Sequence, residues 1–319
     1  LISNQKVFKL YGERLRNCLN SSHFQTTEIL IPDGEKYKNL QTLEYIYTYL
    51  IAQGADRQST ILALGGGVTG DIAGFAAATF HRGVPYIQIP TTLLAQVDSS
   101  VGGKTGVNHT LGKNLIGAFY QPHFVVVDTD TLATLPAREY RSGLYEVLKY
   151  GLIYDLGFYE YLEARMEDVQ NRVPDALETV ISRCCEIKAE VTSLDESETD
   201  LRRILNFGHT FGHALEAATG YTEMTHGEAV GHGMIAATLL SERKGYLDEP
   251  TSGRIIACIQ RIGKLPQISG LSIESVLEAM ARDKKRQQER THFVLLRQIG
   301  KTVIESVPEE SLLREIWDR

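Results

Sequence analysis

The stretch that decides the fold is ILALGGGVTGDIAGFAAAT, residues 61–79. A short apolar run leads into glycines, and an alanine-rich segment of helical composition follows. Gly65, Gly67 and Gly70 have the GxGxxG spacing, in which glycines let the backbone approach a pyrophosphate at the N-terminus of a helix. The stretch therefore predicts a strand, a tight turn and a helix that could bind a nucleotide.

The standard dinucleotide fingerprint also has an acidic residue about 20 positions further on, which holds a ribose. Pro90 and Thr91 stand at that distance here, and Asp98 lies too far along the chain. A glycine turn that serves only packing is the alternative. We interpret the stretch as a nucleotide site, but not one of the standard Rossmann form.

Short apolar runs alternate with a helical pattern in the first part of the chain, which predicts a mostly parallel sheet with ligands at the carboxyl ends of its strands. The expected strands are Ile29–Ile31, Thr60–Leu64, Tyr86–Ile89 and Phe124–Asp128, and the expected helices include Leu40–Gln53 and Ile72–Thr79.

Long helical patterns dominate from Glu139 onward, and only His292–Leu296 looks extended. The expected helices cover 139–165, 175–196, 200–219, 226–245, 251–263 and 272–284. Pro136 interrupts the pattern at the change of character. We predict a Rossmann-like but non-standard α/β nucleotide-binding domain over 1–136 and a mainly α-helical domain over 137–319.

The composition of the 319 residues is that of a globular protein, and the net charge of −7 argues against a nucleic-acid partner or an anionic membrane surface. The four cysteines form no CxxC motif, and no apolar run could span a bilayer. No signal peptide is recognised, so a cytoplasmic location is expected. Because the chain starts with Leu1, residues could be missing upstream.

A second glycine-rich segment, DSSVGGKTGVN at 98–108, carries Lys104 among small residues. It lacks the four-residue spacer of a P-loop, so ATP binding by that route is not expected. A lone lysine here would be read as solvated surface. Asp98, Lys113 and Asn114 lie nearby in the sequence and favour an anion or polyol site.

Four of the nine histidines fall within NFGHTFGHALEAATGYTEMTHGEAVGHGM, residues 206–234. His209 and His213 are four apart and would share one helical face, and His226 opens the next helix. Glu146, in an otherwise apolar helix, is the best candidate for a third metal ligand, because a buried carboxylate is costly unless it is paired or metal-bound. The alternative is a simple ion pair between Glu146 and Lys149. His232 alone is more simply a packed histidine.

Arg202, Asn206, His209 and His213 are spaced i, i+4, i+7 and i+11, which predicts one polar stripe along a helix. Such a stripe is either a solvated face or the wall of a polar site. The flanking apolar residues favour the site.

These motifs together resemble the 3-dehydroquinate synthase family, in order and in spacing, from about Asp33 to Leu296. The segments that carry the resemblance are GGGVTGDIAGFAAATFHRG, IPTTLLAQVDSSVGGKTGVN, GKNLIGAFYQP, LYEVLKYG and LNFGHTFGHALE…HGEAV. The first strand region of the family is expected to be missing.

The resemblance implies an NAD- and divalent-metal-dependent carbon–oxygen lyase of the shikimate pathway. Its substrate would be 3-deoxy-D-arabino-heptulosonate 7-phosphate, and its products 3-dehydroquinate and phosphate. Oxidation of the C5 hydroxyl would acidify the C4 proton so that phosphate can leave, and hydride return, ring opening and aldol closure would follow. The metal, Zn²⁺ or Co²⁺, would polarise the C5 oxygen.

The resemblance also assigns roles to residues of this chain. The metal ligands would be Glu146, His209 and His226. The NAD contacts would be Asp33, Glu35, Lys38, Gly66, Gly67, Asp71, Thr91, Thr92, Lys104, Lys113, Thr134 and Leu135. The substrate carboxylate would bind Lys188 and Arg202, and its phosphate Lys104, Asn114, Asn206, His213 and one of Lys284 and Lys285. Asp98 and Lys149 would hold ring hydroxyls and Glu198 would orient the site. The protein would be a homodimer in which Arg82 reaches the partner's phosphate site.

Two positions depart from the family pattern: Glu289-Arg290 replaces a common Gly-Lys, and Asn4 stands where an Asp commonly contacts the adenosine ribose. Three other classes of protein are alternatives to this family. Cyclases acting on other sugar phosphates need no group for a carboxylate. Metal-dependent alcohol or polyol dehydrogenases release NADH. An NAD-sensing scaffold would have a degenerate site.

Overall fold

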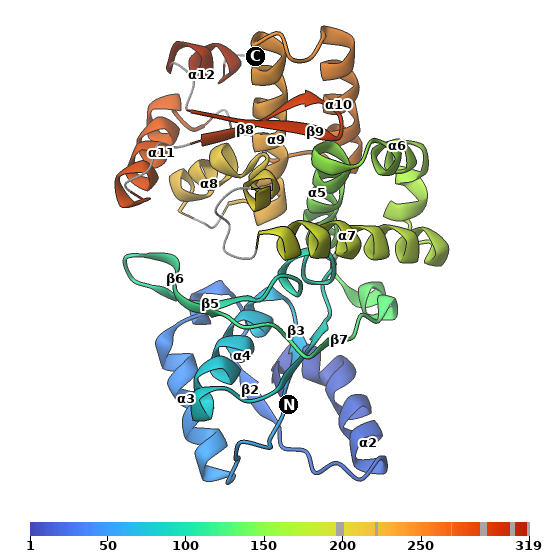
Figure 1. Cartoon of the computed structure of the whole chain (residues 1–319), viewed down its shortest axis with the longest axis vertical. Coiled ribbons are helices and arrows are strands. Elements are labelled where there is room, and N and C mark those ends of the chain that lie inside the picture. Colours follow the sequence, from blue (N-terminus) through green and yellow to red (C-terminus); the bar gives the residue numbers. More distant parts are fainter. Residues whose placement is uncertain (196–200, 221–222, 269, 288–291, 307–309, 318–319) are drawn as a thin grey trace. The chain divides into compact units, whose positions relative to one another are not determined.

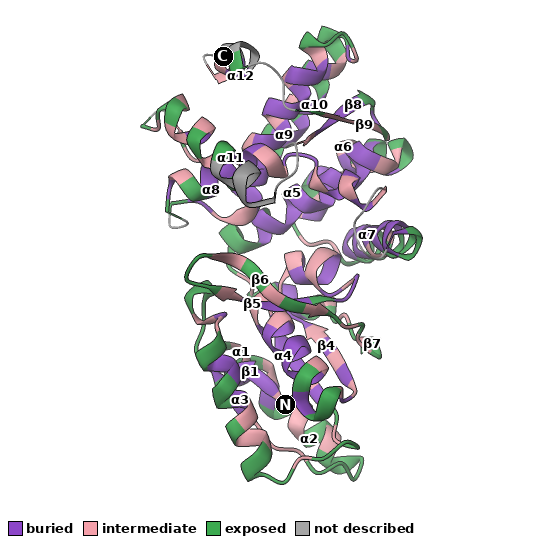
Figure 2. Ribbon diagram, turned by 60° about the vertical axis from the view of Figure 1, so that its left-hand side comes forward, coloured by how far each residue is buried: buried purple, intermediate pink, exposed green. Residues whose placement is uncertain are grey.

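The computed structural model describes residues 1–195, 201–220, 223–268, 270–287, 292–306 and 310–317. Within it the chain divides into two compact units, Leu1–Leu135 and Pro136–Arg319. Figure 1 shows their elements, and Figure 2 shows that each unit has a buried interior of its own. Among the described residues, no helix combines the length and the apolar character needed to cross a membrane.

Unit 1 is built on a five-stranded sheet in the order β2-β1-β3-β4-β7, in which all neighbours are parallel. Its strands are β1 (Ile2–Asn4), β2 (Ile29–Ile31), β3 (Ile61–Gly65), β4 (Tyr86–Pro90) and β7 (Phe124–Val125). Numbered in chain order, the five run 2-1-3-4-5, which is a doubly wound order but not that of the standard dinucleotide domain. The predicted parallel, non-standard α/β fold is confirmed. The strand β1 was not predicted.

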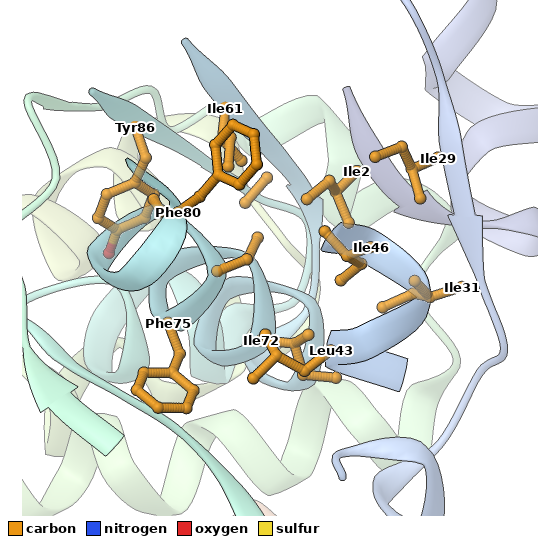
Figure 3. Close-up of a cluster of buried hydrophobic side chains, with 14 of the residues drawn as sticks. Ile2, Ile29, Ile31, Leu43, Ile46, Ile61, Ile72, Phe75, Phe80 and Tyr86 are labelled. Carbon is orange, nitrogen blue, oxygen red and sulfur yellow. The ribbon is translucent and has the colours of Figure 1, made fainter. Parts of the chain in front are cut away.

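The core of unit 1 lies between this sheet and two helices, α3 (Leu40–Ala52) and α4 (Gly67–Thr79). Figure 3 shows Ile46 of α3 next to Ile2 of β1, and Ile72 of α4 next to Leu43 of α3. The same buried cluster contains Ile29 and Ile61 of the strands. A parallel sheet is covered on both faces, which is why its strands are short continuous apolar runs. The small residues of α4 bring that helix close to the sheet.

The other elements of unit 1 are short helices and one hairpin. The helical segments are α1 (Gln5–Val7), a π-helical turn at Phe8–Gly12, α2 (Glu13–Ser21), 3-10 turns at Glu35–Tyr37, Phe80–Arg82 and Thr129–Thr134, and a π-helical turn at Ala95–Ser99. The hairpin pairs β5 (Lys104–His109) with β6 (Gly112–Phe119). The sequence pattern suggests a glycine-rich loop at 98–108, but from Lys104 onward the segment forms a strand. Gly106 and Gly117 face each other across the hairpin, where a Cβ on either would lie 2.5 Å or less from a backbone oxygen.

Unit 2 is mainly helical, as predicted. Its helices are α5 (Ala137–Tyr154), α6 (Leu156–Gln170), α7 (Pro174–Leu194), a 3-10 segment at Leu201–Asn206, α8 (His209–Ala218), α9 (His226–Arg243), α10 (Glu249–Ile262), α11 (Ile273–Gln287) and α12 (Glu310–Trp317). An antiparallel hairpin joins β8 (His292–Gln298) to β9 (Lys301–Ser306). Helix α9 packs against α5, α8, α10 and β8, so it is the central element of the unit.

Three details of unit 2 differ from the prediction. The expected helix at 139–165 is two helices, because the Asp155 side chain accepts a hydrogen bond from the Phe158 amide at 3.0 Å and begins α6. The expected helix at 200–219 is also interrupted. Gly208 adopts a left-handed conformation, φ +79°, and separates the 3-10 segment from α8. The strand β9 was not predicted.

Candidate metal centre and nucleotide site

Three side chains that the sequence analysis assigned to a metal meet in unit 2. Glu146 lies in the middle of α5, and His209 and His226 are the first residues of α8 and α9. The Nε2 atoms of His209 and His226 lie 3.5 Å and 3.4 Å from Oε1 of Glu146. In a tetrahedral zinc site with bonds of about 2.1 Å, neighbouring ligand atoms are about 3.4 Å apart. The spacing therefore suits a single bound ion.

The Glu146 carboxylate is fully buried. Burial alone would raise its pKa, but Lys149 and the two histidines outweigh burial and hold the pKa well below its usual range. The Lys149 ammonium lies 2.5 Å from Oε2 and is itself buried. The ion pair between Glu146 and Lys149, which is the alternative to a metal site, is thus present together with the two histidines.

His209 is held in the neutral form that a metal ligand needs. Burial, with the nearby Lys149, lowers its pKa to about 3. Its Nδ1 lies 3.1 Å from the backbone oxygen of Phe207. A carbonyl oxygen can only accept, so Nδ1 carries the proton and donates it. The lone pair of Nε2 is left facing Glu146.

His226 has a carboxylate on each side of its ring. Its Nε2 faces Glu146, and its Nδ1 lies 3.4 Å from Oε2 of Glu216. Burial by itself would lower the pKa of His226, but the two carboxylates outweigh it and raise the pKa to about 10. The surroundings of this ring therefore favour positive charge, whether from a proton or from a metal ion.

The donor set fits a catalytic divalent metal. Two imidazole nitrogens and one carboxylate oxygen are a recognised zinc ligand set that leaves a coordination position open for substrate. Both oxygens of Glu146 are buried, and within the described residues neither has a hydrogen-bond partner in addition to the Lys149 ion pair. A bound cation would satisfy them.

The glycines around the histidines let the three helices approach closely. A Cβ on Gly227 would lie 2.0 Å from the Ser142 oxygen of α5, and one on Gly212 would lie 2.9 Å from the Ala229 oxygen of α9. One on Gly233 would lie 1.8 Å from the Gly208 oxygen. Backbone contacts of this kind bring the starts of α8 and α9 to the middle of α5.

The start of α9 is also fixed by a capping box and an ion pair. The Thr225 hydroxyl accepts from the Glu228 amide, and the Glu228 carboxylate accepts from the Thr225 amide at 2.7 Å. Arg138 of α5 donates to both oxygens of Glu228, at 2.9 and 2.7 Å. The helix that begins with His226 is thereby attached to the helix that carries Glu146.

The remaining predicted residues of unit 2 differ in exposure. Lys188 of α7 and Arg202 are both buried, and the Arg202 amide donates to Asp195 Oδ2 at 3.0 Å. Asn206 is half-buried and His213 is exposed. The expectation of one continuous stripe from Arg202 to His213 is wrong, because the helix is broken at Gly208.

The His213 ring is nevertheless close to the ligand rings. Its centroid lies 5.3 Å from that of His209 and 5.9 Å from that of His226. Glu198 lies outside the described residues, and Lys284 and Lys285 lie in the last part of α11, where only the backbone is described.

The glycine turn of unit 1 has the predicted strand–turn–helix form. Gly66 is the N-cap of α4, and Gly67 is its first residue. Thr91 and Thr92 follow β4 directly, and the Thr91 amide donates to the Gly65 oxygen at 2.9 Å. The carboxyl ends of two adjacent parallel strands thus carry these four residues, at the sheet edge where doubly wound folds bind ligands.

A polar cluster surrounds the buried Lys38 in unit 1. The Lys38 ammonium donates to the Asp71 carboxylate and, at 2.6 Å, to Asn114 Oδ1. Nearby, Asn108 Nδ2 donates to Glu35 at 2.7 Å. The structure brings Asn114, which the resemblance placed with the phosphate ligands, into contact with predicted nucleotide residues.

Other predicted residues of unit 1 lie at element ends and turns. Asn4, at the end of β1, donates through Nδ2 to Asp33 at 3.1 Å. Thr134 is exposed and its hydroxyl lies 2.5 Å from that of Tyr11, while Leu135 is half-buried at the end of the unit. The rest are Asp98 in a π-helical turn, the exposed Lys104 at the start of β5, Lys113 in β6, and the exposed Arg82, whose φ is +68°.

Glu216 is the residue that the sequence analysis missed. It is buried in α8, seven positions after His209, and so lies on the same side of that helix. Together with His213 and His226 it forms a second group whose ligand atoms lie within 4.8 Å of one another. A carboxylate two helical turns from a predicted ligand is the signal that could have identified it.

Comparisons with known proteins agree with this geometry. Residues 28–142 match the family described as 3-dehydroquinate synthase N-terminal, and residues 143–286 match 3-dehydroquinate synthase C-terminal. A 3-dehydroquinate synthase of Pelobacter propionicus is 52% identical over 314 residues, which are 98% of this chain and 87% of that protein.

Two solved structures share the fold over nearly the whole chain. The 2-epi-5-epi-valiolone synthase of Streptomyces hygroscopicus, solved with NAD⁺ and Zn²⁺, is 32% identical, with a TM-score of 0.92 over 99% of this chain and 88% of that one. A 2-deoxy-scyllo-inosose synthase, solved with carbaglucose-6-phosphate, NAD⁺ and Co²⁺, is 31% identical, with a TM-score of 0.90 over 99% and 89%. With both halves matched by family and a relative above 50% identity, the chain belongs to the 3-dehydroquinate synthase family.

Proposed function

We propose that the protein is a 3-dehydroquinate synthase, a phosphate-eliminating lyase that converts 3-deoxy-D-arabino-heptulosonate 7-phosphate to 3-dehydroquinate and phosphate. The observation that carries the proposal is the convergence of Glu146, His209 and His226 in a chain whose two halves both match this family. When bound, Zn²⁺ or Co²⁺ would polarise a substrate oxygen, and NAD⁺ would accept and return a hydride within each turnover.

The residues of unit 2 have distinct roles in this proposal. Glu146, His209 and His226 hold the metal. Lys149, which pairs with Glu146, is close enough to the metal position to orient a ring hydroxyl. His213 and Asn206 bind the phosphate, together with Lys284 or Lys285, and Glu198 orients the site.

The substrate carboxylate is assigned to Lys188 and Arg202. Both cations are more than nine-tenths buried, and burial strengthens their attraction for an anion. A planar guanidinium also matches the geometry of a carboxylate. This pair favours a carboxylated substrate over sugar phosphates that have no carboxylate.

NAD is assigned to the carboxyl edge of the sheet in unit 1. Gly66 and Gly67 give the pyrophosphate access to the amides that begin α4. The other proposed contacts are Asp33, Glu35, Lys38, Asp71, Thr91, Thr92, Lys104, Lys113, Thr134 and Leu135. Lys104 also serves the phosphate with Asn114, and Asp98 holds a ring hydroxyl.

The proposal includes a homodimer in which Arg82 acts on the partner's site. Two features of unit 1 support it: Arg82 is exposed in a left-handed conformation, and large apolar side chains are exposed on β6 and β7. These are Leu115, Phe119 and Phe124. A non-glycine residue held at positive φ costs free energy and is enriched at functional sites.

Hybrid dimers test the trans assignment. Arg82→Ala and Lys104→Ala chains are each expected to be inactive as homodimers, and mixing them should restore activity, since each hybrid has one intact site. A mixture that exchanges subunits, as followed by mass spectrometry, and stays inactive would contradict the assignment.

The reaction itself is tested by phosphate release from 3-deoxy-D-arabino-heptulosonate 7-phosphate with NAD⁺ and Zn²⁺ or Co²⁺, with absorbance recorded for NADH. Stoichiometric phosphate without NADH accumulation is expected. Accumulating NADH would instead indicate a metal-dependent dehydrogenase. If the protein turns over a sugar phosphate that has no carboxylate and does not turn over this substrate, it is one of the other sugar phosphate cyclases. If the metal-loaded protein turns over no substrate, the remaining interpretation is an NAD-sensing scaffold.

A further inference from the structure

Glu216 stands out in unit 2 as a buried carboxylate for which the proposed reaction has no use. It lies on α8 with 7% of its surface exposed, and its Oε2 is 3.4 Å from Nδ1 of His226. The opposite ring nitrogen of His226, Nε2, is the one that faces Glu146. Glu216 therefore contacts the side of the imidazole that points away from the metal position.

The two ligand histidines are supported in the same way. Each presents Nε2 to Oε1 of Glu146 and has an oxygen against Nδ1. For His209 that oxygen is the backbone carbonyl of Phe207, at 3.1 Å, and for His226 it is the Glu216 carboxylate.

The two histidines differ in the source of that oxygen. Both begin a helix, and the carbonyl directly before each ring accepts an amide within its helix: Gly208 from Gly212 at 2.9 Å, and Thr225 from Ala229 at 3.1 Å. His209 uses the carbonyl two positions before it, and His226 uses a side chain from another helix.

We propose that Glu216 is the positioning residue of the metal centre: it accepts the Nδ1 proton of His226 and so fixes the tautomer and the ring orientation in which Nε2 binds the ion. Neutral imidazole has one N–H and one lone pair, so a proton held on Nδ1 leaves the lone pair on Nε2. A carboxylate in this position also makes the ligand nitrogen more basic. The inference rests on the metal site of the proposed function.

The competing assignment is a second ion bound by His213, Glu216 and His226, whose ligand atoms also lie within 4.8 Å of one another. It would use Nδ1 of His226 as a ligand. His226 would then have to give up both ring protons to serve two ions at once, which is why we favour a hydrogen bond to Glu216.

The test is the Zn²⁺ affinity of the full-length chain, measured by chelator competition with the number of bound ions counted. Glu216→Ala should bind Zn²⁺ about 10–100-fold more weakly, the usual effect of removing a group that orients a ligand. Glu216→Gln keeps an acceptor oxygen in place and should recover most of the affinity. Glu216→Asp keeps the charge but withdraws the oxygen, and should resemble the alanine variant.

Two controls separate positioning from general damage. Glu163→Ala removes a carboxylate that accepts from Arg254 at 2.8 and 2.6 Å elsewhere in unit 2, and should leave the Zn²⁺ affinity unchanged. In a His226→Ala background, Glu216→Ala should cause no further loss of affinity, because the residue acts through His226.

Several outcomes would overturn the inference. Wild-type Zn²⁺ affinity in Glu216→Ala would do so. A loss of affinity from Glu216→Ala that is as large in the His226→Ala background as in the wild type would also do so. So would a Glu216→Asp variant with full Zn²⁺ affinity beside a Glu216→Gln variant that does not bind Zn²⁺. Two bound ions in the wild type, one of them lost with Glu216, would make Glu216 a ligand instead. A wild-type protein that binds neither Zn²⁺ nor Co²⁺ would remove the proposed function as well. If Glu216→Ala does not fold, the Gln and Asp variants decide between these outcomes.

Discussion

A methyl group added at Gly227 should weaken metal binding although the residue has no metal-binding atom. In Gly227→Ala, the new Cβ would lie 2.0 Å from the Ser142 backbone oxygen and 2.6 Å from its carbonyl carbon. Real Cβ contacts stay above 3.0 Å, so α9 and α5 would have to separate by about 1 Å at this point in a close-packed interior. The neighbour is backbone, so no side-chain rotation can relieve the contact.

The magnitude combines two opposing effects. Overpacking a core costs up to about 3 kcal/mol. Replacing glycine by alanine inside a helix returns about 1 kcal/mol. The expected net loss of unfolding free energy is about 2 kcal/mol. The same displacement moves His226 relative to Glu146 by several times the roughly 0.2 Å that metal–ligand distances tolerate. Zn²⁺ affinity should fall by about 10–100-fold.

Urea unfolding of the metal-free protein and chelator competition for Zn²⁺ measure the two effects separately. The midpoint should fall with the m-value unchanged. Gly253→Ala, in α10, is the matched control, because a Cβ there meets nothing within 4 Å, and that variant should bind Zn²⁺ normally. Normal Zn²⁺ affinity in a destabilised Gly227→Ala would refute the coupling of helix spacing to ligand geometry, and wild-type stability would refute the steric argument itself.

Other perturbations have equally definite outcomes. His226→Ala should abolish turnover and lower the Zn²⁺ affinity well beyond the roughly 10–100-fold expected for Glu216→Ala, to the weak binding that Glu146 and His209 provide, while the metal-free protein unfolds near the wild-type midpoint. Full activity in metal-stripped wild-type enzyme would contradict the site. Lys38→Met should weaken NAD⁺ binding, measured by fluorescence titration, because it leaves Asp71 without its cation. Burial alone would raise the pKa of Glu228, but hydrogen bonds from Arg138 and Thr225 outweigh it and lower the pKa below its ordinary 4.5. Its contribution to stability is therefore present above pH 4.5 and lost as the pH falls through the lowered pKa, so the stability difference between wild type and Glu228→Gln should shrink in acid, and a difference constant down to pH 3 would contradict this.

The sheet and most helices could be predicted because their patterns are local. An apolar run, a glycine turn and an alanine-rich segment predict the strand β3 and the helix after it. The hairpin at 104–119 could not be predicted, because glycines in a sequence suggest a loop. Only the paired strands show that Gly106 and Gly117 must be glycines, since a Cβ on either would meet the opposing backbone.

The candidate metal residues were accessible for a different reason. A glutamate in an apolar helix and histidines beside glycines are chemically unusual wherever they occur, so the sequence alone indicates Glu146, His209 and His226 as candidate ligands. The sequence does not indicate Glu216, because an acidic residue on a helix is common. Only the structure shows that it is buried and lies against His226. The break at Gly208 also depends on a backbone conformation that spacing does not reveal.

The close approach of backbones around the metal centre has a consequence for how such a site can be altered. A ligand histidine has chemical relatives, and cysteine or a carboxylate can occupy the same coordination position. Glycine has no smaller replacement, so Gly227 and Gly233 permit no substitution without moving a helix. A redesign of this centre for another metal could therefore replace the ligand side chains. It could hardly change the glycines, which contact only the backbone of a neighbouring segment.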